Sequence, residues 1–125
     1  MWWQQYRTEV DAVFQGERWS RNSIPGVRKL RVEASQNSGA GAIALAVYQG
    51  ARRVILLGYD CQRTSGRAHW HPDHPGVMGN CGALPDWPRQ YRELAPQLRG
   101  AQIINCSRAT ALDVFPLGRL EEVLA

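Results

Sequence analysis

The residues before one apolar stretch are of types that could bind phosphate or ribose. Residues 35–41 read Ser-Gln-Asn-Ser-Gly-Ala-Gly and precede a run with helical spacing. The first backbone N–H groups of a helix have no partner within the helix, and the helix dipole adds positive potential there. We therefore predict that Asn37, Ser38, Gly39 and Gly41 bind a ligand. The alternative is that Ser38 only caps the helix and the glycines only allow tight packing.

Asp60 ends a second apolar run, in the sequence Gly58-Tyr59-Asp60. A carboxylate there could bond a ribose, hold a metal or act as a base; alternatively it caps a loop. Gly39 to Ala44 also fits the dinucleotide pattern G-x-G-x-x-A, with Asp60 near the position of the ribose-binding acid. A nicotinamide- or flavin-dependent oxidoreductase fragment is therefore an alternative.

All three histidines of the chain, His69, His71 and His74, lie within six residues. The string H-x-H-x-D-H matches the metal motif of the metallo-β-lactamase fold, but that fold needs an apolar strand before the motif and further histidines after it. Residues 62–68 are polar and no histidine follows His74, which argues against this family. A histidine that transfers a proton, a smaller metal site and a purely structural loop all remain open.

Asn105 and Ser107 follow a third apolar segment and so are predicted to complete the pocket. Alternatively, Thr110 only caps a short turn, and the segment that contains Asn105 and Ser107 does not contact a ligand. Cys106 has no neighbouring histidine or acid in the sequence, so it is interpreted as a buried structural thiol.

The elements expected to position these residues alternate between helix and strand. Apolar spacing predicts helices over 2–14 and 40–49, an outer strand over 27–32 and a buried strand over 54–57, with loops over 19–26 and 61–85. The strand at 27–32, the helix at 40–49 and the strand at 54–57 are predicted to form a βαβ unit. A helix beginning near Trp87 and shortened by Pro96, a strand over 101–106 and a helical turn over 120–124 complete the pattern. This order predicts a single α/β domain over 1–125, a three-layer Rossmann-like sandwich with a short, mainly parallel sheet. Because three strands make a thin sheet, we also expect an incomplete domain that is completed by self-association.

The composition limits the classes of partner. The net charge is +4 and all basic residues but Lys29 are arginines, spread along the chain rather than in one run. A solvated surface is the favoured interpretation, and nucleic-acid binding is the alternative. No apolar run reaches the roughly 20 residues that span a bilayer. With no signal-peptide pattern and three cysteines lacking C-x-x-C spacing, we expect reduced thiols and a cytoplasmic protein without a membrane partner.

Residues 37–41, 50–60, the histidine loop and Asn105-Cys106-Ser107 together resemble uncharacterised bacteriophage-encoded proteins. These are similar to a Rossmann-like group that includes bacterial family-42 sialyltransferases and archaeal 6-hydroxymethylpterin diphosphokinase-like proteins. The resemblance implies a nucleotide at Asn37, Ser38, Gly39 and Asp60, a base among the three histidines, and the host cytoplasm as the compartment. It also implies a strand and a Gly-Pro-Ser turn ahead of Trp2-Trp3, so that this chain would be a truncated or subunit-completed version.

Together these observations predict a nucleotide- or nucleotide-sugar-binding protein, with glycosyltransferase-like chemistry as its enzymatic form. The alternatives are a non-catalytic interaction or nucleic-acid-binding protein and the oxidoreductase fragment. No particular cofactor or metal is predicted.

Overall fold

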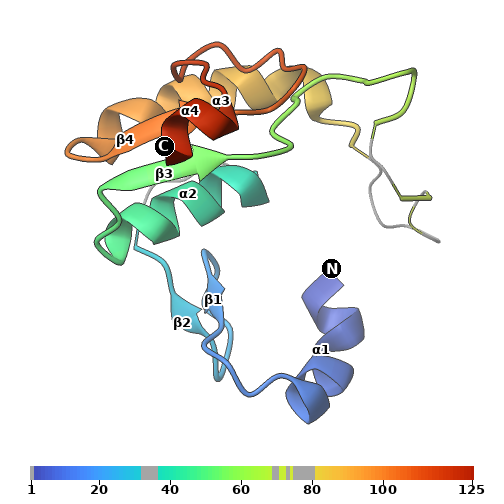
Figure 1. Ribbon diagram of the computed structural model, residues 1–125. Coiled ribbons are helices and arrows are strands. Elements are labelled where there is room, and N and C mark those ends of the chain that lie inside the picture. Colours follow the sequence, from blue (N-terminus) through green and yellow to red (C-terminus); the bar gives the residue numbers. More distant parts are fainter. Residues whose placement is uncertain (1, 32–36, 69–70, 73, 75–80) are drawn as a thin grey trace.

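The computed structural model describes residues 2–31, 37–68, 71–72, 74 and 81–125. Helices alternate with short strands along the chain (Figure 1). The elements are α1 (Trp2–Val13), β1 (Trp19–Ser20), β2 (Arg28–Lys29), α2 (Ser38–Tyr48), β3 (Arg53–Leu56), the 3-10 helix η1 (Leu84–Asp86), α3 (Trp87–Leu94), the 3-10 helix η2 (Ala95–Leu98), β4 (Gln102–Asn105) and α4 (Leu120–Leu124).

The strands form two separate parallel pairs within the described residues. β3 pairs with β4 over four residues, from Arg53 opposite Gln102 to Leu56 opposite Asn105, and β1 pairs with β2 over two. The crossover between β3 and β4 runs through α3, which makes this the βαβ unit of the fold. The predicted unit was different, because it joined the strand at 27–32 to the strand at 54–57 through α2. The structure instead pairs β2 with β1, a strand inside the segment predicted as loop. Arg28 and Lys29 are both exposed, so this strand has too little apolar surface for the inside of a sheet.

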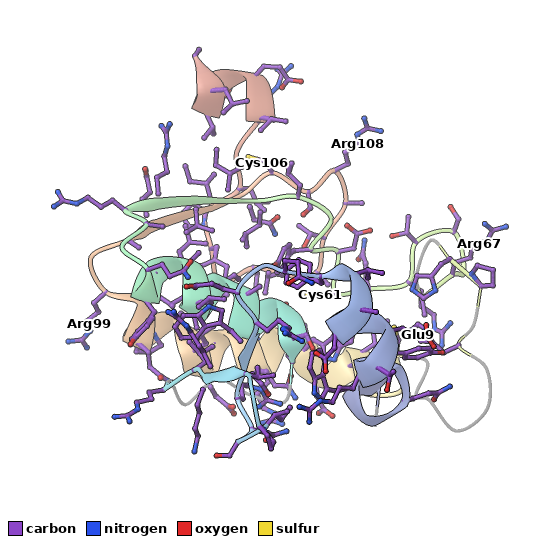
Figure 2. All side chains as sticks on the ribbon, turned by 90° about the horizontal axis from the view of Figure 1, so that it is seen from below. Glu9, Cys61, Arg67, Arg99, Cys106 and Arg108 are labelled. Atoms are coloured by element: carbon purple, nitrogen blue, oxygen red, sulfur yellow. The ribbon has the colours of Figure 1, made fainter. Side chains whose placement is uncertain are left out.

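Helices α2 and α3 pack against each other and against one face of the β3–β4 pair (Figure 2). Ile43 of α2 and Leu94 of α3 are at most 2% exposed, and burying each side chain contributes about 1.5–3 kcal/mol. The predicted helix over 40–49 is thus confirmed, although it begins two residues earlier. Pro96 shortens α3 as predicted, since the chain continues as the 3-10 helix η2.

On the other face of the β3–β4 pair, the described residues contribute only the five-residue helix α4 and the segment leading to it (Figure 2). Gly118 allows this segment to approach Ile104, because a Cβ there would lie 2.7 Å from the Ile104 side chain. Leu57, Leu117 and Leu124 nevertheless remain 57%, 68% and 64% exposed. The described part of the chain is therefore a mixed α/β arrangement with short parallel two-stranded sheets.

The first helix lies apart from the β3–β4 pair, beside the segment that contains β1 (Figure 1). Arg7 donates a hydrogen bond to the carbonyl oxygen of Pro25 at 3.1 Å, and Arg18 forms an ion pair with Asp11. Among the described residues, no helix is both long enough and apolar enough to cross a membrane.

Candidate functional site

The bend that follows β3 is fixed by hydrogen bonds from the loop that follows β4. The Tyr59 amide donates to the Ser107 hydroxyl oxygen at 2.8 Å, and the Thr110 hydroxyl donates to the Tyr59 carbonyl oxygen at 2.7 Å. The Ala111 amide donates to the Asp60 carbonyl oxygen at 2.8 Å. Gly58 permits the bend with a φ of +73°, a conformation that favours glycine. These bonds hold the backbone of Asp60 in one position at the carboxyl ends of two parallel strands.

The Asp60 side chain borders two adjoining hollows, of about 620 and 690 Å³. The Thr64 hydroxyl donates to its carboxylate at 3.0 Å. Arg67 and His71 line the first hollow, while Ser107 and Arg108 line the second; Asp60 and Thr64 belong to both. We call this group of six residues the carboxyl-edge site: Asp60, Thr64, Arg67, His71, Ser107 and Arg108.

Two arginines of the carboxyl-edge site have no counter-ion among the residues that the structure describes. Within the part of the chain that the structure describes, neither Arg67 nor Arg108 forms an ion pair or a side-chain hydrogen bond. Figure 2 shows both pointing outward, at the opposite end of the molecule from Arg99. Other exposed arginines do form ion pairs, for example Arg92 with Asp113 at 2.8 Å. Arg67 and Arg108 can therefore bind an anion without first breaking an ion pair.

The structure brings only one predicted histidine to this site. His71 lines the hollow with Asp60, and its Nδ1 lies 2.7 Å from the Pro72 carbonyl oxygen. His74 is exposed, with its ring centroid 4.8 Å from that of His71, and His69 lies outside the described residues. No group of three histidine, cysteine, aspartate or glutamate side chains that could hold a metal ion occurs in the described ranges.

The start of α2 differs from the sequence expectation. Asn37, not Ser38, is the N-cap, and its Oδ1 accepts hydrogen bonds from the amides of Gly39 at 2.8 Å and Ala40 at 3.3 Å. The Gly41 amide donates to the Asn37 carbonyl oxygen at 3.1 Å. The expectation that these amides stay open to a ligand is therefore wrong, because one short polar side chain and its own backbone satisfy them.

Two tyrosines complete this corner. The Tyr91 hydroxyl donates to Asn37 Oδ1 at 3.2 Å, and the Tyr59 hydroxyl lies 3.4 Å from the Gly39 carbonyl oxygen. A Cβ at Gly39 would overlap the Tyr91 hydroxyl and would lie 3.1 Å from the Tyr59 ring. Gly39 therefore makes room for tyrosines of the protein itself. We call Asn37, Gly39, Tyr59 and Tyr91 the Asn37 corner.

The other predicted binding residues fall in different places. Ser38 and Gly41 line a separate hollow beside β1. Asn105 is completely buried and holds its own loop: its side chain accepts from the Ser107 amide at 3.0 Å and donates to Thr110 at 3.2 Å. Asn105 thus positions Ser107 and does not itself face a ligand.

Cys61 borders the site but is poorly suited to be a nucleophile. Burial, with a smaller contribution from the Asp60 charge, raises the pKa of its thiol to about 11. The reactive thiolate is then scarce at neutral pH. Cys61, Cys81 and Cys106 are all free thiols.

Sequence reasoning missed Thr64, Arg67 and Arg108. A signal was available, because Arg108 follows the strand that ends at Asn105 by three residues, at the same edge as Asp60. Comparison with protein-family models, with curated proteins and with solved structures found no match for this chain.

Proposed function

We propose that the chain binds a nucleotide-type anion at the carboxyl-edge site. The observation that carries this proposal is that Arg67 and Arg108, on the two loops beside Asp60, form no ion pair within the described ranges. Guanidinium groups form paired hydrogen bonds with phosphate oxygens, and a carboxylate accepts hydrogen bonds from ribose hydroxyls. A ligand with both groups, a nucleotide or a nucleotide sugar, matches both kinds of side chain.

The ligand class is the one expected from the sequence, but the proposed contacts differ. Asp60 and Ser107 keep their predicted roles, with Thr64, Arg67 and Arg108 added. Asn37, Gly39 and Asn105 are assigned to the scaffold, since each is engaged in the packing or hydrogen bonding of its own loop. The oxidoreductase alternative is not proposed. In the dinucleotide-binding pattern, backbone amides at the start of the helix bind pyrophosphate, but here the Gly39 and Ala40 amides already donate to Asn37.

In a transferase version of this function, His71 is the group that would move a proton. It lines the same hollow as Asp60 and is half-buried, so it could accept the proton of an acceptor hydroxyl in that hollow. The acceptor oxygen would bond to the transferred group as the bond between that group and the nucleotide's phosphate breaks, and the nucleotide would leave with its phosphate. We propose the cytoplasm as the compartment, and the three free thiols support a reducing environment.

A calorimetric titration with nucleotides and nucleotide sugars tests the binding proposal. We expect the Arg67→Ala/Arg108→Ala double variant to bind at least tenfold more weakly than the unchanged chain, since hydrogen bonds to charged groups are each worth about 1.5–3 kcal/mol. Arg99→Ala is the matched control: it also removes an arginine without an ion pair among the described residues, at the other end of the molecule (Figure 2). Equal affinity of the double variant and the control would refute the proposal, as would no binding by the unchanged chain.

We also propose that the chain associates with a second copy through the thinly covered face of the β3–β4 pair. The exposed leucines Leu57, Leu117 and Leu124 support this proposal, because exposed apolar side chains favour association. Leu57 directly follows β3, Leu117 bridges to Asn105 at the end of β4, and Leu124 ends α4. Light scattering coupled to size-exclusion chromatography should give twice the monomer mass, and Leu117→Lys should restore the monomer. A monomer at all concentrations would contradict it.

A further inference from the structure

Another hollow, of about 840 Å³, lies between α1, the segment that contains β1 and Ser38 at the start of α2. It shares no lining residue with the carboxyl-edge site. Trp3 of α1 and Trp19 of β1 both line it, together with Arg7, Arg18 and Asn22. We call these five residues the tryptophan hollow. Two half-buried indole rings in one concave surface offer flat apolar faces on which another aromatic ring can stack.

Guanidinium groups already lie over both indole rings. The Arg18 guanidinium is 5.9 Å from the centroid of the Trp3 ring, and that of Arg28 is 5.6 Å from the Trp19 ring. Arg7 and Arg18 both bind Asp11, whose pKa is lowered chiefly by the hydrogen bond from Arg18. Glu17 likewise pairs with Arg28 at 3.0 Å and accepts a hydrogen bond from the Trp19 indole at 3.2 Å. Three guanidinium groups thus face two carboxylates here, a net charge of +1.

The positive charge of the whole chain is concentrated in the same region. Residues 1–31 contain six basic and three acidic residues, a net charge of +3, out of +4 for all 125 residues. Three of the five tryptophans also lie in this segment. The hollow therefore combines stacking surfaces with positive charge, and its complement is a ligand with aromatic rings and repeated negative charges.

We infer that the tryptophan hollow binds single-stranded nucleic acid. Bases take the place of the Arg18 and Arg28 guanidinium groups over the Trp3 and Trp19 rings, and the displaced guanidinium groups bind the backbone phosphates. An unpaired base exposes the ring face that an indole needs, whereas the bases of a duplex cover each other's faces. Side chains that stack on bases and attract phosphates bind strands with little sequence preference, and salt weakens that binding. This function is separate from the one proposed for the carboxyl-edge site.

Fluorescence anisotropy with a labelled oligothymidylate tests the inference, with tryptophan quenching as a direct measure of stacking. Trp3→Ala should lower the affinity for the oligonucleotide roughly tenfold. Trp3→Phe should lower this affinity less, because a smaller aromatic face remains. Arg18→Ala should lower the slope of log affinity against log salt by about 1, since one phosphate contact is lost. Far-ultraviolet circular dichroism checks that each variant keeps its helices.

Arg99→Ala is again the control, because it removes the same charge from a residue that does not line the tryptophan hollow. It should leave the affinity for the oligonucleotide within twofold of the unchanged chain. Three results would each overturn the inference: unchanged affinity in a folded Trp3→Ala variant, equal losses for Arg99→Ala and Arg18→Ala, or a duplex of the same length competing as well as the single strand. An oligoribonucleotide arm distinguishes RNA from DNA as the preferred strand.

Discussion

The Asn37 corner and the carboxyl-edge site look alike in sequence but differ in structure. Both have glycine and short polar side chains next to an apolar element, in the pattern typical of ligand-binding loops. At the Asn37 corner the chain satisfies its own donors, because Asn37 and Tyr91 occupy the space that a ligand would need. At the carboxyl-edge site the Arg67 and Arg108 side chains form no ion pair or hydrogen bond among the described residues. A polar glycine-containing loop thus indicates a binding site only when its donors are not already used by the protein.

Substitutions at two glycines of α2 give the sharpest test of this difference. Gly39→Ala should lower the free energy of unfolding by about 2–3 kcal/mol, because its Cβ would overlap the Tyr91 hydroxyl. Gly41→Ala should raise it by about 0.5–1 kcal/mol, since alanine favours the helix and the nearest atom of another side chain is 4.0 Å away. Urea denaturation measures both. Similar values for the two variants would mean that Gly39 does not pack as described.

Removal of the Asn37 side chain should have the next largest effect. Asn37→Ala leaves the Gly39 and Ala40 amides and the Tyr91 hydroxyl without their acceptor, at a cost of about 1–2 kcal/mol in unfolding free energy. Asn37→Asp is the control: it keeps the acceptor oxygen and should lose less. If both variants lost the same unfolding free energy, the hydrogen bonds accepted by the Asn37 side chain would not be the source of this stability.

The sequence predicted the main elements, α2, α3 and the strands β3 and β4, because their apolar periodicity reflects the core that they form. It did not predict which strands pair. The alternating pattern around Arg28 and Lys29 is compatible both with an outer strand of the main sheet and with the separate pair that β2 forms with β1. It placed Asp60 and Ser107 at the same edge correctly, through the rule that the carboxyl ends of parallel strands meet there.

What the sequence could not predict depended on residues distant along the chain. Asn37 is recognised as a cap from local rules, but Tyr91, which fills the corner, lies 54 positions later. The same holds for the role of Asn105, which is set by complete burial and not by its neighbours in sequence.

Asp60→Asn should separate binding from stability. The substitution keeps an oxygen that can accept from Thr64 but removes the charge, and Asp60 is only half-buried. We expect the unfolding free energy to change by less than about 0.5 kcal/mol and nucleotide affinity to fall roughly fivefold to tenfold. Asn37→Ala should show the reverse pattern, with lost stability and nearly unchanged affinity for the ligand when measured on folded protein. A large stability loss in Asp60→Asn would assign Asp60 to the scaffold as well.

The smallest expected effect is a dependence of stability on alkaline pH that arises from Cys61. Burial raises the pKa of this thiol from 9.0 to about 11 in the folded chain, so the unfolded chain loses its proton first as the pH rises. The stability from this residue is therefore complete below pH 9 and declines between about pH 9 and 11. Cys61→Ala should flatten this decline in urea denaturation series, whereas Cys106→Ala should leave it unchanged. If the slope were the same in Cys61→Ala as in the unchanged chain, the thiol beside Asp60 would be more accessible to water than its 9% exposure indicates.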